Sequence, residues 1–272
     1  MQIRLMGILN ITPDSFSDGG NYYNNPQKAV RHARQMLEEG ADCIDIGGES
    51  TRPGSESTSA EEELRRVLPV ITAIKSQLGS EIRISIDTWK AAVANAALKS
   101  GATAINSLGG FLFDEKLAEV AAKQHCPVII YHVKGLPKTM QKGKITYTDV
   151  CREISTFFEE QLAFGVKKGV KREQFILDPG IGFGKTVEQN IEIIKNLAKF
   201  KRFGLPILIG ISRKSHLGTI LKDSLHYETK STERIEASLA ETAIAAQNGA
   251  NIIRTHDIMQ TKKFLTILEK FL

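Results

Sequence analysis

The feature that most restricts the fold of this chain is an alternation of short apolar runs with amphipathic segments, repeated about eight times. Several of the runs are apolar at nearly every position, which is typical of parallel strands buried on both faces. The segments between them have helical periodicity, and some end at a glycine that suits a helix terminus, such as Gly101. Eight runs are expected to be strands: RLMGILN, ADCIDIG, IRISID, ATAIN, PVIIYH, QFILD, PILIGIS and ANIIRTH.

Alternation of this kind predicts an α/β fold with a parallel sheet and right-handed crossovers. Two architectures fit it: a closed (β/α)₈ barrel, also called a TIM barrel, and an open doubly wound sheet of the Rossmann or flavodoxin kind. The number of repeats and the length of 272 residues favour the barrel. Since no Pro- or Ser-rich linker divides the chain, residues 1–272 are expected to form a single domain.

The composition excludes several classes of protein. Hydrophobic residues make up 42% and charged residues 25%, as in an ordinary globular protein. No apolar run is long enough to cross a bilayer and the first residues lack a signal-peptide pattern, so no membrane contact and a cytoplasmic location are expected. The net charge of +5 is scattered and forms no polybasic tract. We therefore expect no nucleic-acid partner, and a positive field suited to a small anionic substrate.

The three cysteines, Cys43, Cys126 and Cys151, form no CxxC pair. Two of them lie in or beside apolar runs, and free cysteine is among the most buried residue types. We therefore expect buried or half-buried thiols, without a disulfide framework or a zinc site.

Two motifs resemble functional sites but lack a required part. The stretch GIGFGKT at residues 180–186 is similar to a phosphate-binding loop, but Pro179 replaces the first glycine that such a loop needs. His132 and His256 have no second ligand at metal-binding spacing. Each of these histidines is expected to be a polar or core residue and not a dedicated metal ligand.

Almost every predicted strand is followed by a polar residue at its C-terminal end. In a (β/α)₈ barrel these ends converge on one mouth, where the active site lies. So many polar side chains together predict a site for a polar heterocycle and an anion, because barrel packing does not require them there. In chain order they are Asn10, Asp45 with Glu49 beyond it, Asp87, Asn106, His132, Asp178, Ser212 with Lys214, and Arg254 with His256.

Two of the predicted strand–helix loops, at residues 10–20 and 47–54, are long and rich in glycine and serine. Loops of this composition are suited to closing over a ligand and excluding water. Arg52 on the second loop can contact a phosphate through two parallel hydrogen bonds.

Seven segments resemble, in order, the signature blocks of the dihydropteroate synthases, and they extend over nearly the whole chain. They are MGILNITPDSFSDGG (6–20), IDIGGESTRPGS (44–55), SIDT (85–88), INSLGG (105–110), LDPGIGFGKT (177–186), ISRKSHLG (211–218) and RTHD (254–257). The resemblance implies a (β/α)₈ barrel of folate biosynthesis. Such an enzyme condenses 7,8-dihydropterin-6-ylmethyl diphosphate with p-aminobenzoate to 7,8-dihydropteroate and pyrophosphate.

The resemblance also implies roles for individual residues. Asp87, Asn106, Asp178 and Lys214 match the pterin-binding positions, and a carboxylate can accept two N–H groups of the aminopyrimidinone ring. Loss of pyrophosphate would leave a cation delocalised into the pterin. Asp87 and Asp178 would stabilise it, so that Asp87, Asp178 and Lys214 are the expected catalytic residues.

The remaining matches concern the diphosphate and p-aminobenzoate. Asn10 is expected beside Mg²⁺, the implied cofactor, and Arg52, Arg254 and His256 are expected on the diphosphate. The matched p-aminobenzoate positions are Phe16, Thr51, Pro53, Phe183 and Ser212. The identities of Phe16 and Pro53 are those expected of sulfonamide-sensitive synthases, so competitive inhibition by sulfonamides is predicted. The family also implies a homodimer.

The chain departs from the family pattern at two places. Tyr131-His-Val-Lys134 stands where a Met-His-Met-Arg-like segment is expected, and His216 stands where a larger apolar residue is usual. Two other functions remain open from the sequence: a pterin-dependent methyltransferase, which would need a corrinoid partner, and a catalytically silent pterin-binding protein. A silent binding protein is disfavoured by the matched residues Asp87, Asn106, Asp178, Lys214 and Arg254.

Overall fold

The computed structural model describes residues 3–12, 25–50, 55, 57–135, 140 and 145–271. Its eight strands are all parallel and form one sheet in the order β6-β5-β4-β3-β2-β1-β8-β7. A parallel bridge between Leu177 and Ile207 joins β6 to the start of β7, so the sheet closes on itself. The strands are β1 (Arg4–Asn10), β2 (Cys43–Gly47), β3 (Ile84–Asp87), β4 (Ala104–Leu108), β5 (Val128–Tyr131), β6 (Phe175–Asp178), β7 (Leu208–Gly210) and β8 (Ile252–Thr255).

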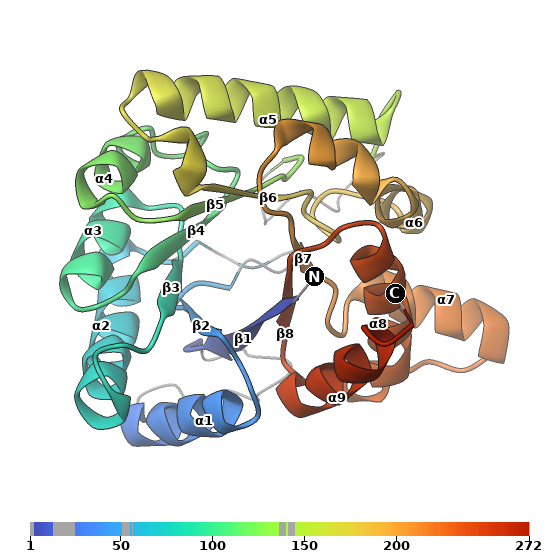
Figure 1. Cartoon of the computed structure of the whole chain (residues 1–272), viewed down its shortest axis with the longest axis horizontal. Coiled ribbons are helices and arrows are strands. Elements are labelled where there is room, and N and C mark those ends of the chain that lie inside the picture. The colour runs from blue at the N-terminus through green and yellow to red at the C-terminus, as the bar shows by residue number, and fades with distance from the viewer. Residues whose placement is uncertain are drawn as a thin grey trace.

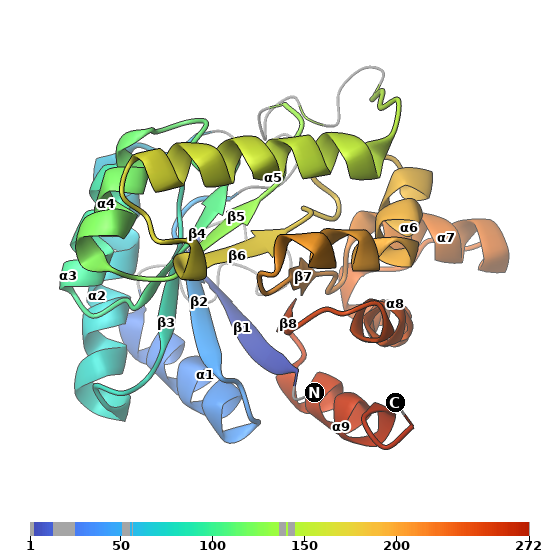
Figure 2. The same ribbon diagram turned by 45° about the horizontal axis from the view of Figure 1, so that its top comes forward.

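Helices surround this sheet as an outer layer (Figure 1). The second view shows α5 lying across the outside of β5 and β6, and α7 extending away from the barrel (Figure 2). The helices are α1 (Pro26–Glu38), α2 (Ala60–Leu78), α3 (Ala91–Lys99), α4 (Lys116–Gln124), α5 (Val150–Lys167), α6 (Val187–Lys195), α7 (Ser215–Leu225), α8 (Ile235–Gln247) and α9 (Ile258–Leu268).

Apolar clusters hold the barrel together, and two of them lie on opposite sides of the strands. The larger lies between strands and helices, where Phe158 of α5 is fully buried and meets the rings of Phe200 and Phe203 edge to face. The smaller contains Met6, Ile129 and other side chains from alternate strand positions. Since successive strand residues point to opposite faces, this second cluster fills the barrel interior below the mouth.

The same alternation places polar side chains above that cluster. In β1 the residues that follow Met6 on the same face are Ile8 and Asn10, and Asn10 is the last residue of the strand. Along β1 the interior therefore changes from apolar at the N-terminal end to polar at the C-terminal end. The predicted TIM barrel is confirmed, and the open doubly wound alternative is wrong because β6 and β7 meet.

Two expectations about position need correction. Asp45 and Asn106 were expected at strand ends, but each lies inside its strand, β2 or β4. Both strands continue for two residues because Gly47 and Leu108 still pair with their neighbours. The cysteines are as expected: Cys43 is partly buried, and Cys126 and Cys151 are buried. Within the described ranges, no helix is both long and apolar enough to span a bilayer.

Candidate functional site

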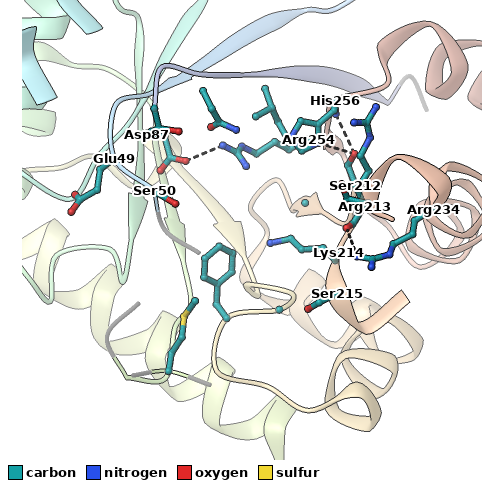
Figure 3. A pocket seen from close by; sticks show the side chains of 18 residues that line it. Glu49, Ser50, Asp87, Ser212, Arg213, Lys214, Ser215, Arg234, Arg254 and His256 are labelled. Carbon is teal, nitrogen blue, oxygen red and sulfur yellow. Dashed lines mark hydrogen bonds and ion pairs between the residues drawn. The ribbon is translucent and has the colours of Figure 1, made fainter. Parts of the chain in front are cut away.

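A cavity of about 360 Å³ opens at the C-terminal ends of the strands (Figure 3). Its walls come from β1, from the end of β3, from the segments after β2, β5 and β6, from those around β7 and β8, and from the segment before α8. Most of its charged groups are cationic, which suits a ligand that carries negative charge. The described lining residues are Ile8, Asn10, Thr12, Glu49, Ser50, Asp87, Met140, Gly182, Phe183, Gly210, Ser212, Arg213, Lys214, Ser215, Ser231, Arg234, Arg254 and His256.

Arg254 of β8 links the two carboxylates at the base of this cavity. Its Nε lies 2.6 Å from Oδ2 of Asp45, and its Nη2 lies 2.9 Å from Oδ2 of Asp87. The Nδ2 group of Asn106 also donates to Asp45 Oδ2, at 3.0 Å. Tyr131 completes the network from β5, because its hydroxyl donates to Asp87 Oδ1 at 3.1 Å. Five strands thus contribute to one hydrogen-bonded network across the barrel.

Burial of this network raises the pKa of one of its carboxylates. The Asp45 side chain is inaccessible to solvent, and the Asp87 side chain is 11% exposed. Burial raises the pKa of Asp87 to about 7, the Arg254 charge opposes the rise, and the Asp45 charge adds to it. Removing one partner of such a buried pair costs roughly 3–5 kcal/mol, because the other charge is left without compensation.

A second network joins the ends of β7 and β8. Ser212 Oγ lies 3.0 Å from Nδ1 of His256 and accepts the His256 backbone N–H at 3.2 Å. Arg213 has a positive φ of 60° and binds Asp257 through both Nε and Nη2. These contacts hold the segment that begins α7 against the strand that carries Arg254.

The segment after β6 is stabilised by hydrogen bonds between its own residues. Asp178 Oδ1 accepts the backbone N–H of Gly180 at 2.7 Å. The buried ammonium group of Lys185 donates to the carbonyls of Gly180 and Phe183 and lies 2.9 Å from Nδ1 of His132. Burial lowers the pKa of both Lys185 and His132. Lys185 therefore binds the carbonyls of its own loop, and His132 packs edge to face on Phe157 below the mouth.

Lys214 and Phe183 form the wall between this segment and α7. Lys214 Nζ lies 4.1 Å from the centre of the Phe183 ring, within the range of a cation–π contact. Burial, and then the charge of Arg254, lowers the pKa of Lys214 to about 8. The pKa of Asp178 is raised to about 6 by burial, against the Gly180 hydrogen bond and the Lys214 charge. The Lys214 charge therefore favours the ionised form of Asp178, whose pKa of about 6 lies close to neutral pH.

The surroundings of Asn10 suit the binding of a metal ion by its side-chain oxygen. Its carboxamide lies at the end of β1 on the cavity wall, and no hydrogen bond joins it to another residue in the described part of the chain. Mg²⁺ retains several waters and needs only one or two protein oxygens when a substrate phosphate also binds it. A single amide oxygen beside a cavity lined by Arg254 and His256 fits that requirement.

The structure brings most of the predicted residues around one cavity. Asn10, Asp87, Phe183, Ser212, Lys214, Arg254 and His256 line it. Asn106 and Asp178 are buried and do not belong to its lining, although Asn106 binds Asp45, the partner of Arg254, and Asp178 interacts with the charge of Lys214. Phe16, Thr51, Arg52 and Pro53 lie outside the described residues. The expectation that His132 faces the mouth is wrong, and its reading as a core histidine is confirmed.

Sequence reasoning missed several residues of the networks. Asp45 was named as a strand-end residue without a role in the site, although an acid in an apolar run signals a buried partner. Tyr131 and Lys185 gave no such signal, because tyrosine and lysine are common at strand ends and in loops. Arg213 and Arg234 also line the cavity, and Arg234 donates to the carbonyls of Arg213 and Thr229.

Comparison with known proteins gives consistent results. Residues 6–256 match the family described as pterin binding enzyme. The chain is 44% identical over 265 residues to the dihydropteroate synthase of Escherichia coli K12, covering 97% of this chain and 90% of that protein. It is 45% identical over 254 residues to the dihydropteroate synthase of Synechocystis, covering 93% and 85%.

Solved structures agree with this result. The dihydropteroate synthase of Yersinia pestis, in complex with a sulfonamide drug, superposes with a TM-score of 0.92 at 41% identity, covering 99% of this chain and 94% of that one. The Xanthomonas albilineans enzyme in complex with 7,8-dihydropteroate superposes with a TM-score of 0.84 at 34% identity, covering 99% and 94%.

A pair of glycine substitutions tests the importance of the packed loop after β6. Gly180 and Gly204 have φ of +70° and +65°, but a Cβ at Gly180 would overlap the His132 carbonyl oxygen, whereas one at Gly204 meets no atom within 4 Å. Gly204→Ala should cost about 1 kcal/mol for the left-handed conformation alone. Gly180→Ala should cost roughly 1–3 kcal/mol more, and it should lower kcat/KM by displacing Asp178. Urea unfolding and turnover measure both effects; equal stabilities of the two variants would contradict the argument.

Proposed function

The chain belongs to the dihydropteroate synthases of the pterin-binding enzyme family, and from that premise we propose how its residues divide the work of the reaction. The reaction condenses 7,8-dihydropterin-6-ylmethyl diphosphate with p-aminobenzoate, and it yields 7,8-dihydropteroate and pyrophosphate. The observation that carries the assignment of roles is the meeting of three acids, buried Asp45 and Asp178 and partly buried Asp87, with Arg254 and Lys214 at one barrel mouth.

We propose that Asn106, Asp178 and Lys214 bind the pterin ring, together with Asp87. The Oδ1 atom of Asn106 is buried and has no hydrogen-bond partner among the described residues. An unpaired buried acceptor is costly unless a ligand donor satisfies it, and the N–H groups of an aminopyrimidinone can do so. Lys214 can donate to the ring carbonyl or to a ring nitrogen.

Asp87 and Asp178 are proposed to stabilise the reacting centre. When the bond from the pterin methylene to the diphosphate oxygen breaks, the leaving oxygen takes the electron pair and the methylene becomes cationic. Two carboxylates fixed in a largely buried site attract that charge more strongly than mobile water does. The arylamine nitrogen of p-aminobenzoate then forms the new C–N bond and releases a proton.

Arg254 and His256 are proposed to bind the leaving diphosphate. Arg254 uses Nε and Nη2 for the two carboxylates, and a guanidinium has further N–H groups that can face the cavity. Asn10 is proposed to hold Mg²⁺, which neutralises charge on the diphosphate and improves the leaving group when it is bound. Arg52, outside the described residues, is proposed to join them.

Phe183 and Ser212 are proposed to form the described part of the p-aminobenzoate pocket, with Phe16, Thr51 and Pro53 from outside the described residues. Both described residues line the cavity beside the first turn of α7, whose backbone N–H groups attract a carboxylate. Support comes from a structure of the Xanthomonas albilineans enzyme with 4-aminobenzoic acid and from the sulfonamide complex of the Yersinia pestis enzyme.

Three further properties remain predictions. One domain over residues 1–272 is supported by the family match over residues 6–256. A homodimer is supported by exposed large apolar side chains on the outer helices, among them Leu225 and Ile244. A cytoplasmic location rests on the sequence pattern alone.

Pyrophosphate release from the dihydropterin diphosphate tests the function directly. With Mg²⁺ present, release should accelerate when p-aminobenzoate is added and should match the dihydropteroate formed. A sulfonamide should raise the KM for p-aminobenzoate without changing kcat, as a competitive inhibitor does. Tight pterin binding without product would instead indicate a binding protein or a methyltransferase, and indifference to sulfonamide would contradict the proposed pocket.

The pH dependence of kcat/KM should be bell-shaped. Asp178 and Asp87, with pKa values raised to about 6 and about 7, must be ionised, so the rate rises with pH through that interval. Lys214, with its pKa lowered to about 8, must be protonated, so the rate falls above that pH. A Lys214→Arg variant should lose the alkaline limb, because a guanidinium stays charged. A wild-type profile that stays flat from about pH 5 to about pH 10 would contradict these assignments.

Calorimetric titration of Mg²⁺ in the presence of pyrophosphate tests Asn10. Asn10→Ala should weaken Mg²⁺ binding about tenfold, which corresponds to about 1.4 kcal/mol. Asn10→Asp retains an oxygen ligand and should bind at least as tightly as the wild type. Equal affinities of the alanine variant and the wild type would exclude Asn10 from the metal site.

A further inference from the structure

Tyr131 occupies an unusual position among the carboxylates of the site. It is the last residue of β5, is 4% exposed, and pairs in register with Asp178 of β6. Its hydroxyl reaches across β4 to Asp87 on β3, where it donates to Oδ1 at 3.1 Å. Its ring packs on Phe183, with ring centres 5.2 Å apart. Tyr131 is therefore fixed at both its ring and its hydroxyl.

The hydroxyl completes the set of donors around Asp87. One carboxylate oxygen accepts from Arg254 at 2.9 Å, and the other accepts from Tyr131. A carboxylate with a donor on each oxygen cannot rotate about its terminal torsion without losing a hydrogen bond. The two donors therefore determine which face of Asp87 is presented to the cavity that it lines.

The charges around Asp87 make the second donor significant. Arg254 of β8 and Lys214 before α7 favour the ionised carboxylate, whereas Asp45 of β2 and Glu63 of α2 oppose it. Arg254 is shared between Asp45 and Asp87, so one guanidinium serves two acids. Burial keeps the pKa of Tyr131 well above its ordinary value, so the phenol remains a donor throughout the neutral range.

We propose that Tyr131 is a positioning residue of the reaction, whose hydroxyl holds the Asp87 carboxylate ionised and oriented toward the pterin methylene. The inference rests on the role proposed above for Asp87. Tyr131 does not belong to the cavity lining and is nearly inaccessible, so it acts through Asp87 and not on the substrate. Nothing in the strand pattern requires a hydroxyl here, because the other residues of β5 are Val, Ile and Ile.

The test compares two tyrosines that each lose one hydrogen-bonding hydroxyl. Tyr131→Phe removes the donor to Asp87 and keeps the ring. Tyr147→Phe is the matched control, because its hydroxyl donates at 2.9 Å to the backbone carbonyl of Gly184 and not to a carboxylate. The measurements are kcat, the KM for each substrate, the pH profile of kcat/KM at saturating Mg²⁺, and urea unfolding.

Tyr131→Phe should lower kcat about tenfold, the effect of one hydrogen bond to a charged group. The KM for p-aminobenzoate should stay within about twofold, because the lost contact is to Asp87 and not to that substrate. The acid limb of the pH profile should move to higher pH, since Asp87 loses a hydrogen bond that favours its ionised form. Tyr147→Phe should leave that limb in place. Should the phenylalanine variant not fold, Tyr131→Met keeps an apolar side chain without a donor and is expected to give the same shift.

Other results would overturn the inference. An acid limb and kcat equal to those of the wild type would remove any role for the hydroxyl. A higher KM for the pterin substrate at unchanged kcat would indicate direct contact with substrate. The Asp87→Asn variant separates the inference about Tyr131 from the role proposed for Asp87. If Asp87→Asn is active, the proposed role of Asp87 is wrong. If Asp87→Asn is inactive and Tyr131→Phe is unaffected, only the role of Tyr131 is wrong.

Discussion

The site depends on one interaction, the insertion of the Arg254 guanidinium between the carboxylates of Asp45 and Asp87. Buried acids at this depth would be costly alone, because each loses its hydration. Arg254 compensates both, and it does so from β8, on the other side of β1 from β2 and β3. The pair therefore requires the strands to curve into a barrel, since an open sheet would hold these side chains apart. The same burial leaves Asp87 with a pKa near neutrality, which makes its charge sensitive to every neighbouring donor.

Around this charged centre, the walls are held by ordinary hydrogen bonds. Lys185 binds the carbonyls of its own loop, and Gly180 supplies the N–H that fixes Asp178. Ser212 and His256 connect β7 with β8. A site of this kind positions its carboxylates before substrate binds, which is the condition under which fixed charges stabilise a transition state better than water. The buried ion pairs of Arg254 thus supply the charge of the site, and the hydrogen bonds of the surrounding loops keep its side chains oriented.

The apparent phosphate-loop motif, rejected from the sequence because of Pro179, has another role in this fold. In GIGFGKT the lysine is the residue that a phosphate loop would direct at its ligand. Here Lys185 is buried and its ammonium group is used by the Gly180 and Phe183 carbonyls. His132 was likewise expected at the mouth because it follows a strand, but it turns to Lys185 and to Phe157. The Lys185 bonds to Gly180 and Phe183 lie within one loop, whereas the His132 contacts depend on packing between distant segments, which no local pattern records.

The sequence by itself determined the fold class, through the repeated alternation of apolar runs and amphipathic segments, and the family, through signature blocks such as LDPGIGFGKT and RTHD. It also identified several of the polar residues that line the cavity, because a polar residue after an apolar run marks the mouth of a barrel. Only the tertiary structure decided which side chains form hydrogen bonds and ion pairs with one another. Asp45 and Arg254 are 209 positions apart, and Tyr131 meets Asp87 across 44. Such pairs follow from strand register and barrel closure, which are collective properties of all eight strands and cannot be read from the order of residues in any one of them.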